Sequence, residues 1–428
     1  MYGKARSHRS IFGMNWSSAK APLAVKLTLL FLIFLPWFIN LTAQPVLGQT
    51  YRVIYDFTNG ADGWFPATGL TIDAAGNLYG TTALGGLYGN GAVFKLTHFG
   101  SRWVFTLPYG FPDGYDGASP NGRVAIAQNG SLYGTAYLGG ISGGTVFHLK
   151  PSPTAPRSVF AAWDENVLYR FNGYDGAGPQ GDLAFDSLGN IYGTTLNGGD
   201  NGWGVIYKLT PSGGAWTETV LYSAPNCGYG CYPYGGVVLD TAGNLYGVFY
   251  IDRPDGYGAV YELSPSGSGW TEQTVYRFTG GSDGQWPRGG LILSPSGKLY
   301  GTTSTGGSNG GGTVFELTPA SGGWTFNLVY AFSGDIGPQD KLLMDNAGNL
   351  YGTTSDGGGA YGLGSVFKLT PSDGGWTYTS LHDFAGGTDG ADPFCSLVSD
   401  ANGNLYGTTA DGGLGSGQGY GIVFEITP

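Results

Sequence analysis

The chain has 428 residues, of which 81 are glycine and 23 proline; 15% are aromatic, and the formal net charge is −11. Only 11% are charged, less than half of the roughly 25% typical of globular proteins. The aromatic content excludes a disordered chain, and the glycine content excludes helical bundles and coiled coils. The negative charge excludes a nucleic-acid binder. An all-β fold of short strands joined by glycine-rich turns remains.

The N-terminal segment has the pattern of a secretory signal. Residues 1–26 contain five basic side chains and no acidic one, and the stretch 27–41 is apolar. Its 15 residues fall short of the roughly 20 that a membrane-spanning helix needs, which favours a cleaved signal peptide over an uncleaved anchor. We assign the signal to residues 1–48, and we expect a secreted, periplasmic or cell-surface protein without a membrane span in the mature chain.

Loss of residues 1–48 makes the chain more acidic. The remainder carries 14 basic and 30 acidic side chains, a net charge of −16. Such a surface repels nucleic acid and anionic lipid, and it favours cations or neutral ligands.

The rest of the chain is a tandem repeat, marked by the string Leu/Ile-Tyr-Gly. Its seven tyrosines are Tyr79, Tyr133, Tyr192, Tyr246, Tyr300, Tyr351 and Tyr406. A glycine lies three residues before each tyrosine and a proline lies thirteen residues before it. These repeat prolines are Pro66, Pro120, Pro179, Pro233, Pro287, Pro338 and Pro393. A period between 51 and 59 residues is near that of kelch-type propeller blades.

Each repeat contains four strand-like pieces. In the fourth copy the first piece is 236–240; an Asp-x-x-Gly-Asn turn follows, which aspartate and glycine favour, and then the second piece, 245–247. The third piece resembles 313–317, and the fourth carries Trp and Tyr six residues apart, replaced by Trp376 and His382 in the last copy. The predicted fold is an all-β, seven-bladed β-propeller over residues 51–428, with four antiparallel strands in each blade.

The two ends of the repeat region complement each other. The last repeat lacks a fourth strand, and residues 51–57 resemble one. We therefore expect this N-terminal strand to close the last blade by pairing with the strand at 421–427.

Only three cysteines are present. Cys227 and Cys231 enclose a three-residue loop, and export permits a disulfide between them. Cys395 is expected to be buried as a small apolar residue.

These motifs resemble a known family. Leu-Tyr-Gly-Thr-Thr-x-x-Gly-Gly followed by Gly-x-Val-Phe-x-Leu-Thr-Pro is similar to the bacterial GloVer tandem repeat, and the likeness covers 51–428. The resemblance implies an exported repeat protein, in some relatives with a C-terminal anchor, and no established enzymatic activity. The sequence ends at Pro428 without such an anchor, and its fourth copy, at 246–250, lacks the Thr-Thr and Gly-Gly elements.

The loop between successive blades supplies the candidate site residues. Its length varies, as does that of the loop between the second and third strands, and in a propeller both loops emerge on one face. Six copies carry an aspartate in this loop, two of them with a nearby tryptophan. The candidate binding residues are Asp62, Trp64, Asp116, Asp175, Asp283, Trp286, Asp335 and Asp389. A ring of this kind suits a glycan or calcium, whereas the alternative that we favour is that Asp-Gly shapes the turn.

No motif for catalysis, a metal centre or nucleotide binding stands out, so no catalytic residue and no cofactor other than the candidate calcium ion is assigned. The sequence favours a monomeric binding module for carbohydrate or a surface protein, acting through the variable loop face. Two alternatives stay open: a glycan-cleaving enzyme that uses two of the ring aspartates, and a purely structural envelope protein.

Overall fold

The computed structural model describes residues 49–427 except residues 67, 153–162, 227–230, 253–254, 335–336, 358 and 415–418. The predicted signal peptide lies outside the described residues. The fold is all-β, with a single short 3₁₀ turn, η1 (Gly387–Asp389), among the described residues. In the part of the chain that the structure describes, no helix has the length and apolar character to cross a membrane.

Each repeat forms four strands in the predicted order. The first strands are β2 (Thr71–Ile72), β6 (Ala125–Ile126), β10 (Ala177–Phe185), β14 (Pro233–Leu239), β18 (Ile292–Leu293), β22 (Leu343–Met344) and β26 (Val398–Ser399). The second strands are β3 (Leu78–Thr82), β7 (Leu132–Ala136), β11 (Ile191–Asn197), β15 (Leu245–Phe249), β19 (Leu299–Thr303), β23 (Leu350–Thr354) and β27 (Leu405–Thr409). The third strands are β4 (Ala92–Phe99), β8 (Thr145–Pro151), β12 (Val205–Ser212), β16 (Ala259–Ser266), β20 (Gly310–Ala320), β24 (Ser365–Ser372) and β28 (Ile422–Thr427).

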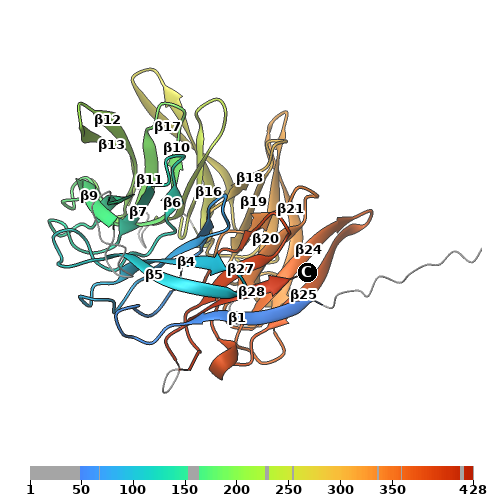
Figure 1. Ribbon diagram of the computed structural model, residues 1–428. Coiled ribbons are helices and arrows are strands. Elements are labelled where there is room, and N and C mark those ends of the chain that lie inside the picture. The colour runs from blue at the N-terminus through green and yellow to red at the C-terminus, as the bar shows by residue number, and fades with distance from the viewer. Residues whose placement is uncertain are drawn as a thin grey trace, which may run out of the picture. The chain divides into compact units, whose positions relative to one another are not determined.

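The fourth strands pair antiparallel with the third strands. They are β5 (Arg102–Gly110), β9 (Trp163–Arg170), β13 (Ala215–Ser223), β17 (Gly269–Arg277), β21 (Gly323–Ser333) and β25 (Gly375–Asp383). The last sheet takes its fourth strand from the N-terminal end: β1 (Thr50–Asp56) pairs antiparallel with β28 (Figure 1). In this pair Tyr51 lies opposite Ile426. The pairing predicted between 51–57 and 421–427 is thus confirmed.

The sheets are not all separate. Five sheets have four strands each, but the third and fourth repeats share one curled sheet of eight strands, joined where β10 runs parallel to β14. The junction pairs Asp182 with Gly236. Here the backbones approach so closely that a Cβ on Gly236 would lie 2.3 Å from the Asp182 carbonyl oxygen. Glycine at this position therefore permits the two first strands to meet.

The glycine of each Leu/Ile-Tyr-Gly string makes room for an aromatic ring. It lies opposite the aromatic residue of the third strand, and a Cβ there would come within 2.3 to 2.6 Å of that ring. The seven pairs are Gly80 and Phe94, Gly134 and Phe147, Gly193 and Tyr207, Gly247 and Tyr261, Gly301 and Phe315, Gly352 and Phe367, and Gly407 and Phe424. These rings are fully buried, so the repeated motif encodes the packing of the core.

The core consists of clusters that combine residues from neighbouring repeats. One such cluster joins Phe94 of the first repeat to Tyr406 and Val423 of the last. The same neighbour relation appears in a hydrogen bond from a threonine of the second strand to the next repeat: Thr353 donates to the Cys395 carbonyl at 2.9 Å. Thr408 of the last repeat donates in the same way to Thr68 of the first, at 3.0 Å.

Candidate functional site

The two variable loops of a repeat lie side by side. Isolated β-bridges connect the loop before the repeat proline to the loop after the second strand, as at Trp64 with Leu84 and at Gln285 with Thr305. Both kinds of loop therefore lie at the same end of their sheet, as the sequence predicts.

Three of the predicted ring aspartates form turns around their own loops. The Asp283 carboxylate accepts hydrogen bonds from the Thr279 amide at 2.8 Å, the Thr279 hydroxyl and the Tyr276 hydroxyl. Asp62 accepts the same set from Thr58 and Tyr55, and Asp175 accepts from Tyr169 and Asn172. Asp62 and Asp283 are only 6% and 7% exposed. This geometry is that of turn formation, the favoured interpretation, and it leaves little of these two carboxylates for a ligand.

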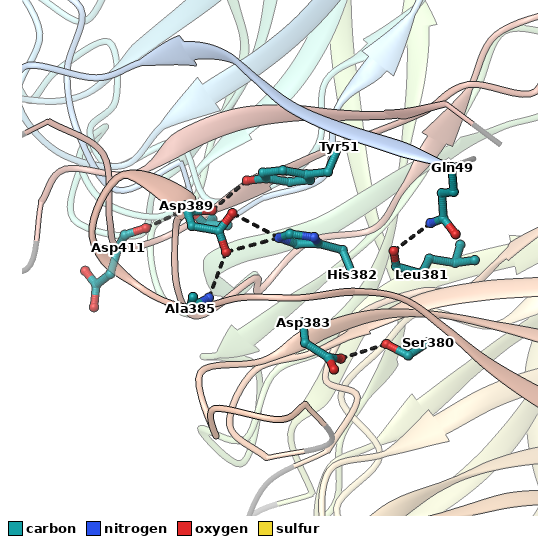
Figure 2. Close-up of polar contacts among 10 residues, drawn as sticks. Gln49, Tyr51, Ser380, Leu381, His382, Asp383, Ala385, Asp389 and Asp411 are labelled. Carbon is teal, nitrogen blue, oxygen red and sulfur yellow. Dashed lines mark hydrogen bonds and ion pairs between the residues drawn. The ribbon is translucent and has the colours of Figure 1, made fainter. Parts of the chain in front are cut away.

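Asp389 occupies the equivalent turn with a different partner. His382 replaces the tyrosine, and its Nε2 lies 3.1 Å from both Asp389 carboxylate oxygens, while the Ala385 amide donates to the same carboxylate at 2.7 Å (Figure 2). The Tyr51 ring stacks on the imidazole with a centroid separation of 3.6 Å. The site therefore ties the last predicted turn to the N-terminal strand.

The remaining predicted residues do not converge. Asp116 forms an ion pair with Arg170 at 3.3 Å. Trp64 packs edge-on against Tyr420, and the Trp286 indole donates to a backbone carbonyl. Asp335 and Cys227 lie outside the described residues, so the roles predicted for them stay predictions. Cys395 is a free, buried cysteine, as expected. Among the described residues, no group of three or more His, Cys, Asp or Glu side chains gathers as a metal site would require.

A different group of residues does converge. A pocket of about 250 Å³, here called the shared pocket, is lined by residues from all seven repeats, nearly all of them one to three positions after a repeat proline. Its polar side chains include Arg123, Asp182, Arg288, Asp340 and Lys341, and its aromatic side chains are Phe65, Tyr234 and Phe394.

The first charged group in the shared pocket is a three-residue network. Asp182 accepts two hydrogen bonds from the Arg123 guanidinium, at 2.6 and 3.3 Å, and a third from the Lys341 ammonium at 3.3 Å. Burial alone would raise the pKa of Asp182, but the two cations overcome this effect and hold the pKa below its ordinary value. Arg123 and Lys341 thus share one carboxylate, and with all three groups ionised this network keeps one net positive charge.

The other two charged residues differ from this network. Burial, together with the nearby charge of Asp182, raises the pKa of Asp340 to about 6. Arg288 donates to the Gln339 side-chain oxygen at 2.8 Å and to the Tyr250 hydroxyl at 3.1 Å. Its guanidinium carbon lies 4.7 Å from the centroid of the Tyr250 ring. Among the described residues no carboxylate lies within ion-pair distance of Arg288.

The shared pocket was not predicted from the sequence, because the candidate residues were taken from the loops that precede the repeat prolines. A signal was present just after them. The equivalent positions are mostly glycine or uncharged, and the second, third, fifth and sixth repeats alone carry charges there. Equivalent positions of the repeats face one another when the repeats are arranged around an axis. Charged residues that replace the usual glycine or uncharged residue at such positions therefore indicate a candidate binding site.

The comparisons with known proteins agree with this architecture. The Gloeobacter/Verrucomicrobia repeat family matches residues 41–166, 159–339 and 296–428. No curated protein matches the chain. One similar solved structure is the extracellular domain of a protein assigned to the hybrid two-component systems of B. thetaiotaomicron, with 13% identity and a TM-score of 0.52 over 87% of this chain and 40% of that one.

Another is PorZ, a surface component of the type-IX secretion system of Porphyromonas gingivalis, with 15% identity and a TM-score of 0.50 over 88% of this chain and 48% of that one. The chain thus spans less than half the length of either protein. At these identities the likeness concerns the fold alone, which is propeller-like. The sequence match, which covers nearly the whole repeat region, shows that the chain belongs to the Gloeobacter/Verrucomicrobia repeat family.

Proposed function

We propose that this protein is an exported seven-bladed β-propeller, closed by its N-terminal strand, that acts as a carbohydrate-binding module. The pairing of β1 with β28 and the Thr408 to Thr68 hydrogen bond support closure, because both connect the two ends of the repeat region. The joined sheet of the third and fourth repeats counts as two blades in this proposal. Export rests on the signal pattern of residues 1–48, with a secreted, periplasmic or cell-surface location.

The observation that carries the binding function is the shared pocket. Every repeat contributes to its lining, and the lining combines aromatic faces with charged and amide groups. Binding pockets in proteins have this composition: mostly apolar or aromatic walls with a few placed polar groups. The pocket begins where the variable loops lead into the first strands, since Phe65 immediately precedes a repeat proline. A sugar suits such a site, because its C–H faces pack on aromatic rings and its hydroxyls bond to polar side chains.

The variable loops support a role in recognition as well. Large apolar side chains are exposed there, and Tyr174 has an exposed fraction of 88%. The others in these loops include Leu87, Tyr88, Tyr115, Leu138, Ile141 and Tyr361. Exposed apolar groups around a pocket are typical of an interaction face. A surface partner could therefore contact the loops while a sugar occupies the pocket, and calcium is the candidate ion for the loop aspartates.

The experiment is a series of thermal melts of the purified protein against a panel of polysaccharides, with and without calcium. A ligand that binds only the folded state raises the melting temperature. The variant Asn121→Trp fills the shared pocket with an indole, and Asn166→Trp, on an exposed position of β9, is its control. We expect the shift to vanish only in the first variant. A melting-temperature shift that persists in Asn121→Trp but is lost in Asp116→Ala would place the binding site in the loops. The absence of a shift with every polysaccharide would overturn carbohydrate binding.

A second candidate function is glycan cleavage in the same pocket. Asp182 and Asp340 both line it, and the shifts of their pKa values have opposite signs. A proton donor and an ionised carboxylate in one pocket are what glycosidic hydrolysis requires. Release of reducing ends from the panel, lost in Asp340→Asn, would support this function; no release would leave the binding function alone.

A further inference from the structure

The shared pocket contains more positive than negative charge, in contrast to the acidic chain around it. Its three cations, Arg123, Arg288 and Lys341, face two carboxylates, Asp182 and Asp340. Asp182 bonds to both Arg123 and Lys341. The cation left without an acidic partner among the described residues is Arg288.

Arg288 is also held in place as a binding group would be. Its Nη1 donates a hydrogen bond to the Gln339 side-chain oxygen, and its Nη2 donates one to the Tyr250 hydroxyl. The guanidinium carbon lies 4.7 Å from the centroid of the Tyr250 ring and 5.9 Å from that of the Tyr234 ring. These contacts fix its orientation without neutralising it. The Nε–H is buried and has no acceptor among the described residues. Arg288 as a whole is half-buried. An oriented guanidinium that is partly removed from water and lacks a counter-charge among the described residues is an incomplete site, because an unpaired charge is costly there.

We propose that the shared pocket selects a sugar that carries a single carboxylate, a uronic acid, and that Arg288 binds this carboxylate. The proposal rests on the carbohydrate-binding function above and names its ligand class. The planar guanidinium fork matches a carboxylate through two parallel hydrogen bonds.

The charge of the site distinguishes a carboxylate from a doubly charged phosphate. With both aspartates ionised the pocket has one excess positive charge, which a monoanion neutralises and a dianion would reverse. The volume of about 250 Å³ lies below the lower limit of about 300 Å³ for drug-sized ligands, so it suits a single sugar ring. Phe65 and Phe394, both half-buried, supply faces for that ring.

The test compares matched ligands on the wild-type protein by calorimetry and thermal melts. Galacturonate, its methyl ester and galactose share one ring, but only the first carries a charge. We expect galacturonate to bind at least about tenfold more tightly than the other two, and added salt to weaken this preference. Acetate, which offers the carboxylate without the ring, is expected to bind weakly.

Variants then assign the carboxylate to Arg288. Arg288→Gln is expected to bring galacturonate down to the affinity of galactose. Arg288→Lys, which keeps the positive charge but loses the planar fork, is expected to retain part of the preference. Arg277→Gln, at an exposed arginine paired with Asp252, is the control and is expected to change nothing.

Each of the other outcomes would overturn one specific part of the proposal. Equal binding of galacturonate, ester and galactose would overturn the uronate proposal and leave the carbohydrate function intact. Acetate binding as tight as galacturonate would mean an anion site without sugar recognition. A preference that survives in Arg288→Gln would remove Arg288 from the proposal. Failure of every sugar and polysaccharide to bind would overturn the proposed function itself.

Discussion

The imidazole Nε2 of His382 lies 3.1 Å from both carboxylate oxygens of Asp389 (Figure 2). At the equivalent position before the fifth repeat, the Tyr276 hydroxyl donates to Asp283. In both repeats the aspartate also accepts a hydrogen bond from the backbone amide four residues before it. The aspartate therefore connects the end of the fourth strand to the loop that follows, whichever ring supplies the partner. Loss of that carboxylate leaves several donors of the turn, the half-buried ring group among them, without their acceptor, which is costly.

Because these aspartates hold the turns together, we can predict how removing one of them affects stability. In Asp283→Ala the Thr279 amide, the Thr279 hydroxyl and the Tyr276 hydroxyl lose their acceptor, so we expect the free energy of unfolding to fall by about 2–4 kcal/mol. Denaturant unfolding measures this loss. Asp255→Ala, at an exposed position, is the control. If Asp283→Ala kept wild-type stability and lost ligand binding instead, the ring of aspartates would be a binding site and the turn interpretation would be wrong.

The strands could be predicted from the sequence because the repeat places its glycine, tyrosine and proline at fixed spacings. The position of β1 followed from a missing fourth strand at the other end of the chain, and Tyr51 does lie opposite Ile426. The union of β10 with β14 could not be predicted, because it depends on a close backbone approach at Gly236 that no side-chain pattern records.

The charged positions of the shared pocket can be seen in the sequence, but the contacts between them could not be predicted, for a related reason. Asp182 and Lys341, 159 residues apart, meet only because the first strands of distant repeats face one another. Their charges are visible in the sequence, but which repeats face each other depends on how the sheets are arranged in space. The sequence pattern indicated the loop aspartates as candidate binding residues instead, because they recur in six repeats. A residue that recurs in a repeat more often forms a local turn than binds a ligand.

The glycine of the Leu/Ile-Tyr-Gly string predicts a steric effect on stability. In Gly301→Ala the new Cβ would lie 2.5 Å from the Phe315 ring and 2.8 Å from the Leu291 side chain, so we expect a loss of about 1–3 kcal/mol from overpacking. Gly374→Ala, where nothing lies within 4 Å, is the control. Adding Phe315→Leu removes the ring that clashes, so the double variant should be more stable than the sum of the two single effects. Strict additivity would contradict this explanation of the motif.

The raised pKa of Glu165 allows a prediction of how the stability of the protein depends on pH. Burial and then the charges of Asp116 and Asp113 raise its pKa to about 8. The folded protein therefore retains a proton that the unfolded chain, with a pKa of about 4.5, has lost. The contribution of Glu165 to stability is complete below pH 4.5 and disappears as the pH rises toward 8.

The variant Glu165→Gln, which cannot ionise, isolates this effect. We expect it to match the wild type at pH 4 and to be more stable by about 1–2 kcal/mol at pH 8.5, after allowance for solvent screening. Melting temperatures across this range measure the difference, with Asp164→Asn, on an exposed neighbour, as the control. A wild-type protein as stable as the variant at pH 8.5 would show that Glu165 ionises without cost.

If the proposed ring closes through β1, one N-terminal side chain should support the whole fold. The Tyr51 ring stacks on His382 at 3.6 Å and approaches Phe384 and Phe424, and its hydroxyl donates to the Asp389 carbonyl at 2.5 Å. Because β1 is the outer strand of the last sheet, its loss would expose an edge of β28 and separate the first repeat from the last. We expect Tyr51→Ala to lower the free energy of unfolding by about 2–4 kcal/mol within one cooperative transition. Tyr174→Ala, at a side chain that is 88% exposed, should have no such effect, and an equally small effect in both variants would mean that β1 is a peripheral addition to a fold that closes without it.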